Sequence, residues 1–181
     1  MKKMNFYKVM MMAVVALCSI SLTSCGGDDD DDLTPPSVQT GDVTPSNTSF
    51  EYVVPCLTQG ATRDQVKTYM AGSSWTLETN AAYLKYMNAP GTCEVEYTFF
   101  DDSGEVEGLI KARVKYKKYT EEYWLYLIQE TQKRYNVTLT IDNRDANTGG
   151  AEGTATIDGK QVDISMMKYA GEMYVSFLLR G

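Results

Sequence analysis

The sequence predicts an α+β fold, with one antiparallel sheet of about six to eight strands and two helices packed on one face. Two stretches whose apolar residues recur at helical spacing, near residues 62–71 and 120–136, predict the helices. Several stretches in which apolar and polar side chains alternate predict the strands. The order of these elements is helix, two or three strands, helix and four strands. The domain is therefore expected to have two similar helix-then-strands halves.

The chain begins with the three regions of a secretory signal peptide, which we assign to residues 1–24. Three lysines precede an apolar run over residues 9–20, and Leu22-Thr23-Ser24-Cys25 follows. As a helix the apolar run is ~18 Å long, well short of a ~30 Å hydrocarbon core. The tetrapeptide resembles the lipobox of bacterial lipoproteins, which implies cleavage before Cys25 and lipidation of that cysteine. An ordinary signal peptide with a chance cysteine is the alternative.

Residues 25–50 are expected to form a flexible tether. Gly26-Gly27 and five aspartates at 28–32 follow the lipidated cysteine, and the rest is rich in Pro, Ser and Thr. This composition disfavours packing. The acidic run resembles the export signal of Bacteroidetes surface lipoproteins, which implies a lipid-anchored protein on the outer membrane, facing the cell exterior. A solvated spacer is the alternative interpretation.

Residues 51–181 have the size of a single domain. Of 17 basic and 24 acidic residues, three lysines lie in the signal peptide and six aspartates in the tether, which leaves 14 against 18 and a net charge of −4. This balance does not suggest a nucleic-acid binder. The domain contains Cys56 and Cys93, which are expected to pair in a disulfide if the protein is exported. Two buried free thiols are the alternative.

The first half of the domain opens with a helix and continues into strands. Thr62 and Gln65 fit a capping box, and Gly72 suits the helix end. Residues 75–77 and 82–87 are weaker strand candidates.

A hairpin with strong alternation follows, formed by residues 93–100 and 110–117 around a turn at 101–104. A four-residue loop sets Glu94 against Lys111 and Cys93 against Ala112. This register leaves one face apolar and places charge pairs on the other.

The second helix is predicted to begin after Thr120, with acidic residues in its first turn and basic residues in its last. Its core stripe contains Trp124, Leu127 and Ile128, and Asn136 suits a left-handed cap. Four strands are expected after it, over residues 137–141, 153–157, 162–169 and 172–180.

Residues 59–66, with the sequence Gln-Gly-Ala-Thr-Arg-Asp-Gln-Val, resemble the G-x-T-x-x-x-V helix opening of the small accessory lipoprotein of the barrel-assembly machinery. The same helix-then-sheet unit, doubled, resembles the plan of the β-lactamase inhibitor protein. The chain departs from the accessory family by having a second helix and four further strands, and Ala71-Gly72-Ser73 stands where that family has a glycine-proline pair. The resemblance implies a binding or scaffolding domain without catalysis.

Enzyme chemistry finds little support in the residue types present. The chain has no histidine, which excludes Ser-His and Cys-His catalysis and histidine metal sites. Residues 149–153 lack the lysine of a phosphate loop. The Asp101-Asp102 pair fits a turn, and the acidic and amide residues over 142–147 miss the calcium-loop spacing. We therefore assign no catalytic residue, metal or cofactor.

Two surface features are candidates for partner binding. The first is a basic row on one strand, which could meet anionic groups and comprises Lys111, Arg113, Lys115 and Lys117, with Lys118 beside it. A solvated strand face neutralised by Glu94 and Glu96 is the alternative. The second is a tyrosine row on the second helix, formed by Tyr119, Tyr123 and Tyr126. Burial of the helix on both sides, under the tether or an edge strand, is its alternative.

These observations predict a membrane-anchored, surface-displayed lipoprotein that acts as a binding or interaction module. Its partner is expected to be a glycan or an envelope protein, with the membrane reached through the lipid anchor. An accessory or scaffolding subunit of an envelope complex is the second hypothesis, and an enzyme of unknown type is the third.

Overall fold

The computed structural model describes residues 43–46, 50–72, 74–79, 83–100, 108–143 and 148–180. All described residues belong to one compact unit, residues 39–181. The predicted signal peptide, Cys25 and the acidic run lie outside the described residues. Among the described helices, none combines the length and the apolar character that crossing a membrane requires.

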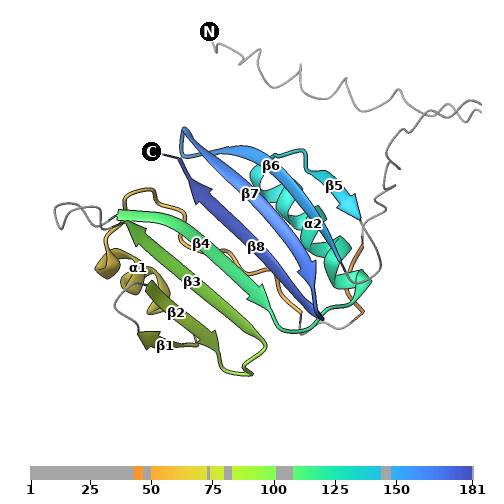
Figure 1. The fold of residues 1–181 in the computed structure, drawn as a ribbon. Helices are drawn as coiled ribbons and strands as arrows, with labels where there is room; N and C mark the ends of the chain where they lie inside the picture. Colours follow the sequence, from red (N-terminus) through yellow and green to blue (C-terminus); the bar gives the residue numbers. More distant parts are fainter. Residues whose placement is uncertain are drawn as a thin grey trace, which may run out of the picture. The chain divides into compact units, whose positions relative to one another are not determined.

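The second unit is built on one antiparallel sheet of eight strands in the order β1-β2-β3-β4-β8-β7-β6-β5 (Figure 1). The strands are β1 (Trp75–Thr79), β2 (Tyr83–Asn88), β3 (Cys93–Phe100), β4 (Gly108–Tyr116), β5 (Thr140–Asn143), β6 (Gly149–Ile157), β7 (Lys160–Tyr169) and β8 (Glu172–Leu179). Helix α1 (Arg63–Met70) precedes β1, and α2 (Glu121–Tyr135) lies between β4 and β5. The predicted α+β fold with one antiparallel sheet and two helices is confirmed.

The sheet order shows how the two halves meet. Each half is a helix followed by four consecutive strands, and the last strand of one half pairs with the last strand of the other, β4 with β8. Such a meander needs only short connections within each half, whereas the β4-to-β5 crossing is made by α2.

Both helices begin and end where local chemistry dictates. The capping box of α1 is present, because Gln65 N donates to Thr62 Oγ1 over 3.3 Å and Thr62 N donates to Gln65 Oε1 over 2.8 Å. In α2, Tyr123 N donates to Thr120 Oγ1, and Asn136 ends the helix in the left-handed conformation at φ 47°.

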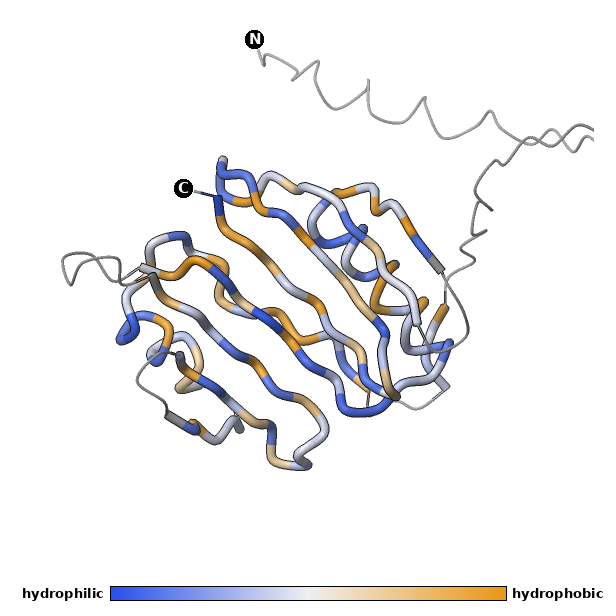
Figure 2. Tube along the Cα trace, in the orientation of Figure 1, coloured by the Kyte–Doolittle hydropathy of each residue, from blue (hydrophilic) through white to orange (hydrophobic). Residues whose placement is uncertain are grey.

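One face of the sheet forms the core. Successive side chains along each strand alternate between buried and outward positions, an alternation that also appears in the hydropathy of the tube (Figure 2). On the buried face, Tyr97 of β3 contacts Met70 of α1, and Lys168 of β7 contacts Glu121 of α2. Both helices therefore cover the same face. The opposite side, which we call the open face, has no helix over it in the described part of the chain.

The β3–β4 register differs from the one expected from the sequence. Glu94 faces Lys115 rather than Lys111, and Cys93 faces Tyr116 rather than Ala112. The connection extends over residues 101–107, outside the described residues, and a bulge shifts the register between Thr98 and Phe99. Because the register moved by four residues, an even number, each side chain kept its predicted face.

The folded part starts earlier than the expected boundary at residue 51. Val43 N donates to the side chain of Gln129, and Ser46 hydrogen-bonds to Glu122, so this part of the expected tether lies along α2. From Phe50 the chain runs extended across the buried face. We call residues 50–58 the strap.

Candidate functional site

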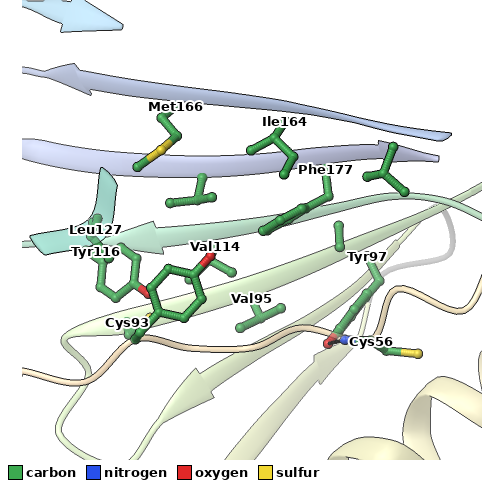
Figure 3. Packing of buried hydrophobic residues seen from close by; sticks show 14 of the residues in the cluster. Cys56, Cys93, Val95, Tyr97, Val114, Tyr116, Leu127, Ile164, Met166 and Phe177 are labelled. Atoms are coloured by element: carbon green, nitrogen blue, oxygen red, sulfur yellow. Dashed lines mark hydrogen bonds between the residues drawn. The ribbon is translucent and has the colours of Figure 1, made fainter. Parts of the chain in front are cut away.

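The two cysteines of the domain are free, so the expected disulfide is not present. Figure 3 places Cys56 beside Tyr97 and Cys93 beside Tyr116. Tyr97 lies four residues after Cys93 on the same strand, a separation of ~13 Å along the backbone. Disulfide geometry requires Cα atoms within about 7 Å, which this arrangement does not allow. The second alternative, two buried thiols, describes the structure.

Burial sets the ionisation of Cys93. Desolvation in the core, and then the neighbouring Glu94 carboxylate, raises the pKa of the Cys93 thiol to about 12. A thiol with this pKa stays protonated at neutral pH and is a poor nucleophile.

The tyrosine row on α2 is covered at its centre. Phe50 of the strap stacks on Tyr123 with ring centroids 4.0 Å apart and planes 4° from parallel, and it meets Tyr126 edge to face at 6.0 Å. Only 4% of Tyr123 remains exposed. The structure thus matches the alternative in which the preceding segment buries this side of the helix. Tyr119 instead joins a cluster with Glu121 and Lys168.

The strap is bound largely through tyrosine hydroxyls. Val53 N donates to the hydroxyl of Tyr116 over 2.9 Å, and Cys56 N donates to the hydroxyl of Tyr97 over 3.0 Å. The hydroxyl of Tyr69 on α1 donates to Val54 O over 3.2 Å. These bonds satisfy backbone groups that have no partner strand. The strap therefore covers part of the buried face.

The basic row lies on the open face, and its charges are largely compensated there. Arg113 pairs with Glu96 at 3.0 Å, Lys115 with Glu172 at 2.9 Å, and Lys117 with Glu94 at 2.6 Å. Lys111 forms no ion pair with any residue that the structure describes. This pattern matches the alternative of a neutralised strand face and gives little support to a site for anionic groups.

Glu94 is the most enclosed acid of this network. It is shared between Lys117 and Lys85, the latter 3.4 Å away. Burial alone would raise the pKa of its carboxyl, but the two ammonium groups outweigh burial and lower it below the ordinary value. The charged half of the open face is thus a connected network of ion pairs.

The open face carries continuous rows of outward side chains. One row crosses six strands from Glu94 through Lys115 and Tyr174 to Met167, and it continues to Gly150 and Asp142. The neighbouring row, on the same face, comprises Glu96, Arg113, Ser176, Ser165, Glu152 and Thr140. Along these two rows the face changes from charge pairs on β3 and β4 to the uncharged Tyr174, Ser176, Met167 and Ser165 on β8 and β7.

A group of exposed, mainly apolar side chains lies at one end of β7 and β8. Met167 is 47% exposed and pairs across the strands with Tyr174. Tyr169 is 59% exposed and pairs with Glu172. We call Met167, Tyr169 and Tyr174 the Tyr–Met patch. Large tyrosine and methionine side chains, held in place by strands, are typical of protein contact surfaces.

A hollow of 360 Å³ adjoins the patch on the open face. It lies over Gly150, and its walls include outward side chains of β5, β6 and β7, among them Asp142, Glu152 and Met167. Gly150 leaves the floor of the hollow without a side chain, and a Cβ there would approach Met166 O to 3.3 Å. The hollow has room for one side chain of a partner.

One buried lysine, Lys168, was not predicted from the sequence. Lys168 is only 2% exposed, and its Nζ lies 3.3 Å from the Tyr119 hydroxyl and 3.2 Å from Glu121 Oε2. Its Nζ also lies 5.9 Å from the centre of the Trp124 ring. Lys168 follows Val162, Ile164 and Met166 at buried positions of β7, so the alternation itself could have identified it. This cluster links the start of α2 to β7.

Within the described residues, no group of three or more potential metal ligands comes together. Asp142 faces the hollow on the open face, whereas Asp145 and Asn147 of the same acidic stretch lie outside the described residues, as do Asp101 and Asp102. Residues 149–153, which lack the lysine of a phosphate loop, belong to β6.

No protein family, no curated protein and no solved structure matches this chain. The resemblances to the barrel-assembly accessory lipoprotein and to the β-lactamase inhibitor protein therefore stay predictions.

Proposed function

We propose that this protein is a membrane-tethered binding module whose open face receives a folded protein partner of the cell envelope. The observation that carries the proposal is an eight-stranded sheet on which both described helices cover the same face. The width of the sheet is seven strand spacings of ~4.8 Å, and its length is that of a strand of about eight residues. The area of the open face is therefore on the order of 800 Å², with the shorter edge strands taken into account. A standard protein–protein interface buries about 800 Å² on each partner.

The chemistry of the open face also favours a protein over a polyanion. Arg113, Lys115 and Lys117 already pair with Glu96, Glu172 and Glu94, so these charges can enter an interface with their partners in place. The Tyr–Met patch supplies exposed aromatic and thioether surface, and the hollow beside it can accept an anchoring side chain.

The proposed location rests on the sequence. The lipobox-like Leu22-Thr23-Ser24-Cys25 and the acidic run at 28–32 support a lipid anchor on the outer membrane and display on the cell exterior. A protein partner is compatible with a displayed interaction module and also with an accessory subunit of an envelope complex.

Two measurements test the anchor and the location. Radiolabelled palmitate should label the wild type and not Cys25→Ala, and the variant should leave the membrane fraction. Protease added to intact cells should remove the domain if it is displayed outside. Protection of the domain, with cleavage only after the outer membrane is opened, would instead favour the accessory subunit.

Cross-linking in intact cells tests the open face. A photoreactive amino acid placed at Met167 should give a defined cross-linked product with one envelope protein. The same amino acid placed at Lys133, which is exposed on α2, is the control and should give none. The captured protein is then purified, and its binding to the wild-type protein is measured. Identical products from both positions, or no product from Met167, would refute the proposal.

A further inference from the structure

A second concave site lies on the helix side of the sheet, away from the open face. It has a volume of 520 Å³ and is bordered by the strap on one side and by the start of β1 and the β2–β3 turn on the other. Phe50, Trp75, Glu51, Lys118 and Thr92 are among its lining residues, and we call it the aromatic cleft. Its size falls within the roughly 300–1,000 Å³ typical of small-ligand sites.

Two aromatic rings form accessible walls of the cleft. Phe50 is held by its stack on Tyr123 and by Tyr116, whose ring centroid lies 5.2 Å away, yet it stays partly exposed. Trp75, the first residue of edge strand β1, is partly exposed as well. The tyrosines beneath are buried. The flat walls are therefore positioned before any ligand arrives, which lowers the entropy cost of binding.

The rim of the cleft carries two opposite charges. Glu51 and Lys118 are both exposed, and among the described residues neither forms an ion pair or hydrogen bond. The indole Nε1 of Trp75 likewise has no hydrogen-bond partner in the described part of the chain. The open face is different, because Arg113, Lys115 and Lys117 there are paired with acids. The cleft thus offers a free acceptor and free donors beside aromatic surface.

These groups fit a neutral sugar ring. A pyranose has flat faces of C–H groups, which pack on aromatic rings, and a border of hydroxyls that both donate and accept hydrogen bonds. Glu51 can accept from one hydroxyl, and Lys118 and the Trp75 indole can donate to others. A polyanion would meet the Glu51 carboxylate, and a cation would meet the Lys118 ammonium. We infer that the aromatic cleft is a binding site for a neutral sugar ring of an oligosaccharide.

The two tryptophans of the chain make the test specific. Trp124 is fully buried, so a ligand-dependent change in tryptophan emission reports on Trp75. The full-length protein, purified in a polyoxyethylene detergent that contains no sugar, is titrated with the hexasaccharides of glucose (α1,4 and β1,4 linked), mannose, xylose and N-acetylglucosamine. Isothermal calorimetry gives the affinity independently of fluorescence.

We expect at least one of these hexasaccharides to shift the Trp75 emission and to release heat on binding. Trp75→Ala should weaken its binding about tenfold or more, because the stacking surface is lost. Lys118→Ala should weaken it about threefold without changing the unfolding midpoint, because Lys118 is exposed and forms no ion pair or hydrogen bond with a described residue. Tyr169→Ala on the open face is the control and should bind like the wild type.

Three outcomes would overturn the inference. The first is no binding of any hexasaccharide at about 10 mM, an affinity too weak for a built site. The second is an equal loss in the Tyr169→Ala control and in Lys118→Ala. The third is binding of free amino acids or of a sulfated oligosaccharide in place of the neutral sugars. None of these outcomes affects the proposed protein partner, because the cleft and the open face are on opposite sides of the sheet.

Discussion

Removing one hydroxyl group, with Tyr97→Phe, tests how the strap is held. Tyr97 is fully buried on β3, and its hydroxyl accepts a hydrogen bond from Cys56 N of the strap and donates to the sulfur of Met70 on α1, 3.3 Å away. One oxygen atom therefore joins the sheet, the strap and the first helix. Phenylalanine keeps the ring and its packing and removes only this link.

The expected loss follows from the donor left behind. Without the hydroxyl, the buried backbone N–H of Cys56 has no acceptor, which costs about 1–3 kcal/mol, and the weaker contact with sulfur is lost as well. We expect Tyr97→Phe to lower the free energy of unfolding by about 2 kcal/mol.

Tyr86→Phe is a matched control on the neighbouring strand. The two rings meet edge to face at 6.1 Å, and Tyr86 is 4% exposed, so both variants lose one oxygen from the same region of the core. The Tyr86 hydroxyl, however, is buried without a hydrogen-bond partner in the described structure. Its removal leaves no donor unpaired, and we expect stability to stay equal or to rise by up to about 1 kcal/mol.

Urea unfolding followed by far-UV circular dichroism measures both variants, with unchanged m-values required for a valid comparison. Hydrogen exchange at the Cys56 amide should accelerate in Tyr97→Phe alone. Equal stability of Tyr97→Phe and the wild type would refute this account of the strap, and so would a loss in Tyr86→Phe as large as that in Tyr97→Phe.

Three further predictions concern the backbone, the thiol and the buried lysine. Gly153→Ala should lower the free energy of unfolding in urea by about 2 kcal/mol, because the new Cβ would lie 2.7 Å from Thr138 O. Gly72→Ala is the control, since a Cβ there meets no atom within 4 Å, and its effect on stability should be near zero. Burial raises the pKa of the Cys93 thiol from 9.0 to about 12. The contribution of this thiol to the free energy of unfolding is therefore complete below pH 9, and up to about 4 kcal/mol of it is lost as pH rises toward 12. When the free energy of unfolding is measured against pH, it should fall less steeply over this window in Cys93→Ala. Glu121→Ala should lower the free energy of unfolding by about 2 kcal/mol, because it leaves the Lys168 ammonium without its carboxylate partner. Lys168→Met should lower it by less. If thermal unfolding shows the reverse order, the assigned pairing is contradicted.

Alternation along the strands predicted the faces of the sheet and left the register open. The pattern over residues 93–100 and 108–116 distinguishes odd from even shifts only, since a shift by two or four residues returns every side chain to its face. The assumed short loop then selected Lys111 opposite Glu94, where the structure has Lys115. The length of the connection and the bulge after Thr98 depend on packing that periodicity does not encode.

The strap shows a second limit of local patterns. The tyrosine row on α2 is amphipathic by sequence, but which side meets solvent depends on a segment about seventy residues earlier in the chain. Phe50 and Tyr52 were the available indication, because two aromatic residues directly after a polar tether are unusual for a chain that only floats. The sequence separation of Cys56 and Cys93 likewise could not decide whether they form a disulfide, because that depends on where the fold places the two side chains.

The candidate surfaces were predictable in part. The basic row and its acidic neighbours could be placed on one face from alternation alone, whereas their pairing required the actual register. The Tyr–Met patch lies on strands that the sequence predicted, but its exposure follows from the arrangement of the described elements, none of which covers Met167 and Tyr169.

The affinity of the envelope protein captured at Met167 tests the central claim most directly. Met167→Glu places a charge in the Tyr–Met patch at a side chain that is 47% exposed, so the fold should tolerate it. Measured by calorimetry with both purified proteins, binding should weaken about tenfold or more in Met167→Glu and stay unchanged in Trp75→Ala, on the opposite side of the sheet. Unchanged affinity in Met167→Glu, or a loss in Trp75→Ala alone, would contradict a partner seated on the open face.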